Sequence, residues 1–115
     1  MIAVIFEVEP RDGRREEYLA MAAALRPVLE KIDGFVSVER FESLTKPGKL
    51  LSLSVFRDEA AINEWRNVMG HRHAQAKGRH EMFANYRIRV TSVIRDYGLQ
   101  ERDEAPADSV AALSG

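Results

Sequence analysis

Apolar and polar residues alternate with a period of two in four stretches of the chain, a pattern typical of β-strands with one well-buried face. The four stretches are residues 2–8, 35–43, 50–56 and 86–94. The second and third are separated by LTKPGK, in which Pro47 and Gly48 take adjacent corner positions of a turn. These two stretches are therefore predicted to form an antiparallel hairpin. In the last stretch, Tyr86, Ile88 and Val90 should share one face, and Arg87, Arg89 and Thr91 the other.

A helical period of 3.6 residues governs the segment between the first and second predicted strands. Its apolar stripe consists of Tyr18, Met21, Ala22, Leu25, Leu29 and Ile32. We expect Asp12 to cap the start of this helix and Gly34 to end it. Pro27 removes one backbone hydrogen bond, so a kink or a break is expected there.

A second helix is predicted after the hairpin, with Asp58 as its N-cap. Its apolar stripe consists of Ala61, Ile62, Trp65, Val68 and Met69. Gly70 should loosen this helix before residues 71–83 make a further turn or two.

The predicted order strand, helix, strand, strand, helix, strand is that of the ferredoxin-like fold, an α+β class with a four-stranded antiparallel sheet and helices on one face. Apolar side chains are also predicted on the other face, namely Val36, Val38, Leu51, Leu53 and Val55. A sheet that is apolar on both sides needs a second cover, and a homodimer would provide it.

Composition narrows the class of protein. The 115 residues fit one domain, and 45% apolar with 30% charged residues is globular. A net charge of -1 gives no reason to expect nucleic acid or an anionic membrane as a partner. The sequence contains no Cys, and its start has no cationic leader, so a cytoplasmic protein is expected. Residues 1–97 are predicted to be the domain, and residues 98–115 a tail that is mobile or packed on the partner subunit.

Side chains capable of chemistry gather between residues 65 and 97, which hold the single Trp and all three His. His71, His73 and His80 do not predict a metal site, because residues two apart point to opposite sides of a helix and no Cys or nearby carboxylate completes the set. Trp65 suits either a core position or a platform for a flat ligand.

The chain resembles a known family in IAVIFEVEPRDG, in GFVSVERFESLTKPGKLLSLSVFRDEAAINEWR and in HRHAQAKGR with its following strand. These segments are similar to the antibiotic biosynthesis monooxygenase domain of the dimeric α+β barrel superfamily, over about residues 1–97. The resemblance implies that two ferredoxin-like subunits pack sheet to sheet. It also implies one of several activities, among them cofactor-independent oxidation of phenols and quinols.

For such an oxygenase the resemblance implies a dry pocket that binds and deprotonates a small aromatic substrate. Trp65, Phe6 and Tyr86 are the expected substrate-binding residues. His71, whose ordinary pKa lies near neutrality, is expected to accept the proton. Arg79 or Arg95 would hold the resulting anion, and no metal or other cofactor is expected.

A haem-degrading activity, also found in the family, is disfavoured. Members of that branch carry an Asn in the first strand, at a position that falls near Phe6 in this chain, where the Asn is absent. They also carry a His nine or ten residues beyond the Trp, where this chain has Ala74 and Gln75. His71 or His73 would approach iron only if the helix broke at Gly70. A third possibility is a dimer of the same fold that binds a small molecule without catalysis.

Overall fold

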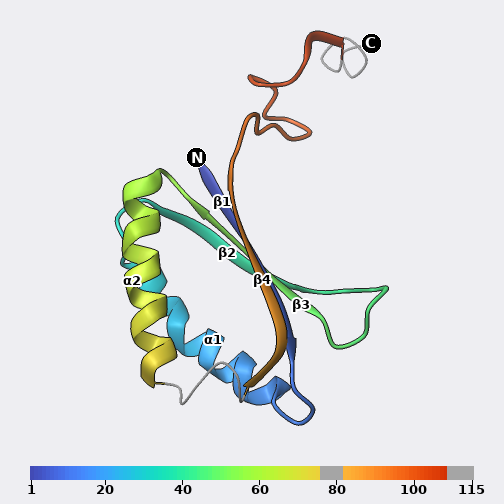
Figure 1. Cartoon of the computed structure of the whole chain (residues 1–115). Helices are drawn as coiled ribbons and strands as arrows, with labels where there is room; N and C mark the ends of the chain where they lie inside the picture. The colour runs from blue at the N-terminus through green and yellow to red at the C-terminus, as the bar shows by residue number, and fades with distance from the viewer. Residues whose placement is uncertain (76–81, 109–115) are drawn as a thin grey trace.

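A computed structural model describes residues 1–75 and 82–108 of the chain, with side chains for all of these except residues 69–75. The elements in chain order are β1 (Ile2–Pro10), α1 (Arg15–Glu30), β2 (Phe35–Glu42), β3 (Leu50–Phe56), α2 (Glu59–Gln75) and β4 (Phe83–Ser92). The four strands form one antiparallel sheet in the order β2-β3-β1-β4. Both helices lie on the same side of this sheet (Figure 1). The predicted ferredoxin-like βαββαβ fold is confirmed.

Strand register assigns every side chain of the sheet to one of two faces, because residues paired across strands point the same way. The helix face carries two central rows, Arg40-Ser52-Phe6-Ile88 and Val38-Ser54-Val4-Val90. The opposite side, here called the open face, carries Ser37, Glu39, Phe41, Leu51, Leu53, Val55, Ala3, Ile5, Glu7, Arg87, Arg89 and Thr91. Leu51, Leu53 and Val55 therefore point away from the helices, as predicted.

Val36 and Val38 were also predicted to lie on the open face. Val38 points to the helices and is 5% exposed, so its assignment to the open face was wrong. The reason is a register irregularity between Phe35 and Ser37, which moves Val38 opposite Ser54 on the helix face. Val36 lies within this irregularity and is largely exposed.

The buried side chains form two clusters beneath the helices. One joins α2 to the end of α1 and contains Val4, Leu29, Ile32, Phe56, Ala61, Ile62 and Trp65. The other surrounds the start of α1 and contains Phe6, Val8, Tyr18, Leu50, Met82 and Phe83. The predicted stripe of α1 is confirmed as its buried side at Tyr18, Ala22, Leu25 and Leu29.

The caps expected for the first helix at Asp12 and Gly34 were wrong, and the break expected as one alternative at Pro27 is absent. The helix starts at Arg15 with Arg14 in the cap position and no side-chain cap bond, so Asp12 is not its N-cap. The helix also runs through Pro27 to Glu30 without a break, because this proline in the last turn removes a single hydrogen bond while the buried Leu25 and Leu29 lie on either side of it.

Gly34 lies beyond the end of the first helix, which is capped at Lys31. Its φ of +93° suits glycine, and a Cβ built there would lie 3.0 Å from the Cβ of Ala61. Gly34 therefore allows the chain to pass close to α2 and does not end α1.

The second helix begins as predicted, with the Ala61 backbone N–H donating to Oδ1 of Asp58 at 3.0 Å. It then continues through Gly70 to Gln75, so the expected loosening at Gly70 was wrong. A single glycine costs a helix only about 1 kcal/mol, which neighbouring turns can offset. The final strand also starts three residues earlier than expected, at Phe83, and ends at Ser92.

After β4 the chain leaves the sheet as an arm, residues 93–108, which extends away from the body of the domain (Figure 1). Local bonds shape it, including Gly98 N–H to the carbonyl of Glu101 at 2.9 Å. Arg102 also lies over the ring of Tyr97, 5.3 Å from its centroid. Within the part of the chain that the structure describes, neither helix is long and apolar enough to cross a membrane.

Candidate functional site

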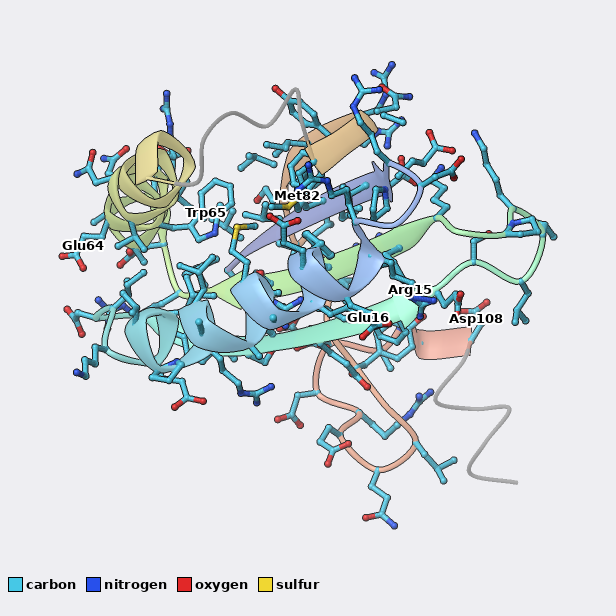
Figure 2. The ribbon with its side chains drawn as sticks, turned by 90° about the horizontal axis from the view of Figure 1, so that it is seen from below. Arg15, Glu16, Glu64, Trp65, Met82 and Asp108 are labelled. Atoms are coloured by element: carbon cyan, nitrogen blue, oxygen red, sulfur yellow. The ribbon has the colours of Figure 1, made fainter. Side chains whose placement is uncertain are left out.

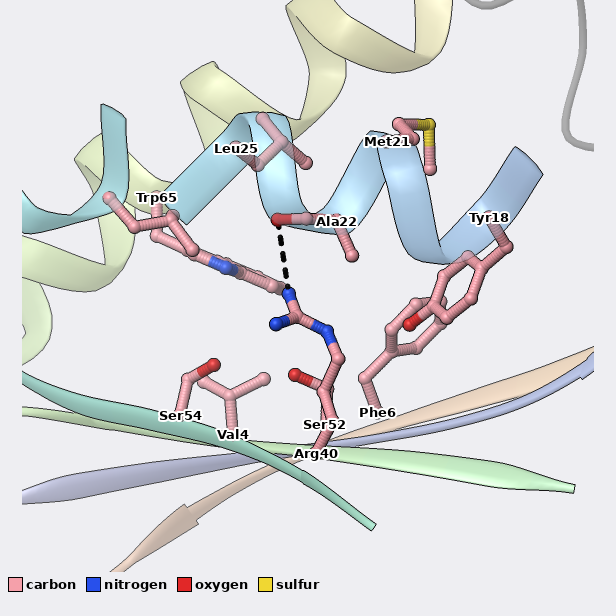
Figure 3. Close-up of a pocket in the computed structure, with 11 residues that line it drawn as sticks. Val4, Phe6, Tyr18, Met21, Ala22, Leu25, Arg40, Ser52, Ser54 and Trp65 are labelled. Carbon is pink, nitrogen blue, oxygen red and sulfur yellow. Dashed lines mark hydrogen bonds between the residues drawn. The ribbon is translucent and has the colours of Figure 1, made fainter. Parts of the chain in front are cut away.

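A pocket of about 30 Å³ lies between α1 and the helix face of the sheet (Figure 3). Its lining residues come from β1, α1, β2, β3 and α2, and are Val4, Phe6, Tyr18, Met21, Ala22, Leu25, Leu29, Arg40, Ser52, Ser54 and Trp65. This volume holds one or two water molecules. A larger ligand needs side chains to move, and the flexible Met21 in the pocket wall is suited to such movement.

The pocket exists because two small side chains interrupt the core along β3. Leu50 belongs to one buried cluster and Phe56 to the other, while Ser52 and Ser54 lie between them on the same face. Both serines are buried, at 7% and 5% exposed. A serine fills far less space than the leucine or phenylalanine on either side, so a hollow remains beneath α1.

Aromatic rings form much of the pocket wall. Trp65, 8% exposed, points from α2 towards the space beside α1 (Figure 2) and packs against Phe56 with ring centroids 6.4 Å apart. Phe6 rises from β1, and Tyr18 faces it from α1 (Figure 3). Flat rings on several sides suit a flat apolar ligand.

One cation enters this apolar space. Arg40 extends from β2 towards α1, between Trp65 on one side and Tyr18 on the other (Figure 3), and its terminal nitrogen donates to the carbonyl of Ala22 at 3.5 Å. Burial raises the pKa of the Tyr18 hydroxyl above its ordinary value, while the nearby charge of Arg40 and a hydrogen bond with it act in the opposite sense. Tyr18 therefore keeps its proton at neutral pH and can donate it in a hydrogen bond.

An exposed apolar strip continues from the pocket to the edge of the sheet. Tyr86, Ile88 and Val90 on β4 are 38%, 42% and 55% exposed. They pair in register with Val8, Phe6 and Val4, so they lie on the helix face beside the pocket. The ring of Tyr86 contacts that of Phe6 edge to face, with centroids 6.0 Å apart. The apolar surface offered to a ligand is therefore wider than the pocket alone.

The structure brings together some of the residues that the sequence singled out. Phe6 and Trp65 line the pocket, and Tyr86 lies next to Phe6. Arg95 is exposed in the arm beyond β4, and the structure gives it no place in the pocket wall. The side chain of His71 and all of Arg79 lie outside the described residues, so their predicted roles stay predictions.

Sequence reasoning did not place the polar pocket residues in the site, namely Tyr18, Arg40, Ser52 and Ser54. The alternation in LLSLSVF did contain a signal, since it places two serines on the same face as Leu50 and Phe56. Arg40 gave a weaker signal, as a charged residue sharing its face with Val38. Among the described residues, no group of three or more His, Cys, Asp or Glu is placed to hold a metal ion.

The fold and the pocket define the class: a ferredoxin-like α+β domain with a small, mostly apolar recess between sheet and helices. The chain belongs to the antibiotic biosynthesis monooxygenase family, whose sequence model matches residues 1–77. A relative named jasmonate monooxygenase ABM, from Pyricularia oryzae, is 45% identical over 93 residues, which cover 81% of this chain. The match spans only 43% of the length of that relative.

Solved structures support the fold. Protein Rv0793 from Mycobacterium tuberculosis has a TM-score of 0.72 at 22% identity, covering 84% of this chain and 98% of that one. A mutant of MhuD with two manganese protoporphyrin IX molecules bound per active site has a TM-score of 0.69 at 16% identity, covering 85% and 99%.

Proposed function

We propose that this chain is a monooxygenase that oxidises a small aromatic substrate of the phenol or quinol type without a metal or organic cofactor. The observation that carries the proposal is the pocket, in which Phe6, Tyr18 and Trp65 surround a recess on a scaffold of the monooxygenase family. The 45% identical relative named a monooxygenase supports the reaction class.

The proposed reaction needs little from the protein beyond binding, deprotonation and exclusion of water. A phenol with a free ring position and one O₂ give a quinone and one water, so oxygen is both the oxidant and the source of the inserted atom. Deprotonation makes the ring electron-rich enough to pass an electron to O₂. The buried walls of Val4, Leu25 and Leu29 keep bulk water from the reactive intermediate.

His71 is proposed to accept the phenolic proton, and Arg79 to stabilise the resulting charge. The proposal rests on the ordinary pKa of histidine, which lies near neutrality. The continuous helix through Gly70 removes the expected helix break as an argument for His71. Loss of a general base should lower turnover of the H71A variant by about 100-fold, with the melting temperature unchanged. Parental turnover would show that another group takes the proton.

A second substrate class is a small, largely apolar carboxylic acid. The relative from Pyricularia oryzae is named for jasmonate, which is a carboxylate and not a phenol. The specific observation in favour is Arg40, a cation among apolar pocket residues. A ligand of either class would bind in the same recess.

No imidazole or thiolate occurs among the described residues of the pocket wall, so these residues supply no histidine or cysteine ligand for haem.

We also propose a homodimer formed through the open face. Leu51, Leu53 and Val55 are only partly buried in one chain, and their side chains point away from both helices. A second copy packed there would remove this apolar surface from water. Sedimentation should then give a mass of about two chains at micromolar concentration, and a stable monomer would contradict the proposal.

The decisive experiment for the reaction is oxygen uptake by purified, metal-stripped protein against a panel of quinols, phenols and jasmonate, with a parallel haem titration. Uptake that depends on both protein and substrate is the expected result. Binding of panel members without oxygen uptake would favour the non-catalytic alternative, and saturable haem binding at one site would overturn the cofactor-free reaction.

A further inference from the structure

Arg40 differs from the arginines that form ion pairs among the described residues. Those pairs lie at the surface: Arg14 with Glu17, Arg15 with Glu42, Arg26 with Glu30, Arg57 with Asp33 and Arg89 with Glu7. Arg40 is partly buried and takes part in no ion pair among the described residues. It is the one charged residue among the described residues that line a mostly apolar recess.

The hydrogen bonds of Arg40 are incomplete as well. Its Nε is buried and has no hydrogen-bond partner. Its terminal nitrogen reaches the carbonyl of Ala22 only at 3.5 Å, the outer limit of a hydrogen bond. A guanidinium has five N–H donors, and a buried donor without a partner is unfavourable.

No carboxylate of the described pocket compensates this charge. None of the described residues that line the recess is acidic. Glu42 lies on the same face two residues along β2, but it accepts from Arg15 at 3.3 Å. Glu39 belongs to the open face, on the other side of the sheet. The recess therefore contains a positive charge with no acidic residue among its described lining.

The neighbouring groups would strengthen the hold on an anionic oxygen. Ser52 is the cross-strand partner of Arg40, and the protonated Tyr18 hydroxyl lies within hydrogen-bonding reach of Arg40. Across the sheet the same row continues from Arg40 and Ser52 to Phe6 and then to Ile88. The floor of the pocket thus changes from charged to polar to apolar along one line.

We infer that Arg40 is a specificity-determining residue that selects a ligand bearing an ionised oxygen acid, either a carboxylate or a phenolate. The acid group lies at Arg40, Tyr18 and Ser52, and the apolar body extends along Phe6. The inference rests on the proposed binding pocket and deepens the proposed function. It adds a residue on β2 to the anion-binding role proposed for Arg79.

Matched pairs of probes test the charge requirement in binding alone. Calorimetric titration compares benzoate with benzamide, which has the same shape without the charge, and 4-nitrophenol below and above the pH of its ionisation. The fluorescence of Trp65, the only tryptophan of the chain, reports whether each probe enters the pocket. The variants are R40Q and R40K, with R26Q as the matched control on the exposed side of α1.

Charged probes are expected to lose about 10- to 100-fold in affinity in R40Q, because a charge-assisted hydrogen bond is worth about 1.5–3 kcal/mol. R40K should retain part of the affinity, and R26Q all of it. If R40Q weakens the binding of benzoate alone, the preferred ligand is a carboxylate. If it weakens the binding of nitrophenolate alone, the preferred ligand is a phenolate, and if it weakens both, Arg40 forms a general anion site. Equal affinities of benzoate and benzamide for the parental protein, or equal losses for both in R40Q, would overturn the inference.

Binding and turnover separate this inference from the proposed reaction. Arg40-dependent anion binding without oxygen uptake upholds the inference and overturns the monooxygenase. Oxygen uptake with neutral quinols that is unchanged in R40Q upholds the monooxygenase and overturns the inference. Should R40Q fail to fold by circular dichroism, the comparison of R40K with the parental protein decides, because it keeps the charge and changes the planar donor geometry.

Discussion

The two faces of β3 reverse the usual arrangement of a protein sheet. The face under the helices carries Ser52 and Ser54 at its centre, although both are almost fully buried. The face that points away from the helices carries Leu51, Leu53 and Val55, which are only partly buried. In most single-chain domains the aliphatic residues would lie under the helices and the serines would face water.

The residues on the two faces of β3 are therefore not explained by the stability of a single chain alone. The serines give up apolar burial beneath α1 and leave a recess that a ligand can use. The aliphatic residues leave apolar area at the surface, which a second copy can cover. A charged residue on the open face, or a larger apolar residue on the helix face, should therefore affect dimer formation, ligand binding and folding stability to different extents.

The largest effect is expected from a charge at the centre of the open face. L53R would place an unpaired cation in each half of the proposed dimer interface, and desolvating it costs several kcal/mol. We expect the dimer dissociation constant to rise by about 1,000-fold, measured by sedimentation equilibrium. L44R is the matched control, because Leu44 is fully exposed at the tip of the β2–β3 hairpin. An unchanged constant in L53R would place the interface elsewhere.

Filling the recess from the helix face should affect binding more than folding. S54V adds apolar volume at the pocket floor, so we expect affinity for pocket ligands to fall at least about 10-fold. The free energy of unfolding should change by less than about 1.5 kcal/mol, since added burial offsets local crowding. Calorimetric titration and chemical denaturation measure the two quantities. Parental affinity for benzoate in S54V would show that the ligand does not use this recess.

Ionisation of the Tyr18 hydroxyl should make the free energy of unfolding depend on pH in the alkaline range. Burial raises its pKa in the folded protein above the ordinary 10.0, so its contribution to stability is complete below pH 10 and is lost as pH rises through the folded value. Over that range the parental protein should lose up to about 1.4 kcal/mol per pH unit from this residue. Y18F should lack this part of the decline in denaturation curves taken from pH 8 to pH 11. Parallel declines would contradict the raised pKa.

The smallest effect is expected from the charged rim of the open face. A hydrogen bond from Arg89, and the charge of Lys49, hold the pKa of Glu7 below its ordinary value of 4.5. Its stabilising contribution is therefore present above pH 4.5 and lost as pH falls through the lower folded value. E7Q should melt about 3 °C below the parental protein at pH 7, and the difference should vanish in strong acid. A difference that persists at pH 2 would exclude ionisation as its cause.

The local pattern of the sequence was sufficient for the elements and their order. Alternation identified the four strands, the 3.6-residue stripes identified both helices, and Asp58 was correctly identified as a cap. These features depend on neighbours close in the sequence, and so they can be predicted from it. The residues of the family resemblance pointed to the same fold, and the match over residues 1–77 confirmed the family.

The candidate site was only partly predictable. Trp65 and Phe6 stood out as large aromatic residues, and both line the recess. Arg40 did not stand out, because an arginine on a strand reads as solvent-exposed until the opposing helix is in place. Only the docking of α1 across β2 turned it into a partly buried cation with an unpartnered nitrogen.

The sequence by itself determined that β3 has one face of leucines and valine and another that contains two serines. Tertiary structure alone decided that the serine face packs beneath α1, because that choice depends on the register with β1 and β2 and on where each helix crosses the sheet. The same holds at Gly70, where local propensity favoured an interruption but the helix continues to Gln75. Packing between distant segments contributes more free energy than a single local preference, and so it overrides that preference.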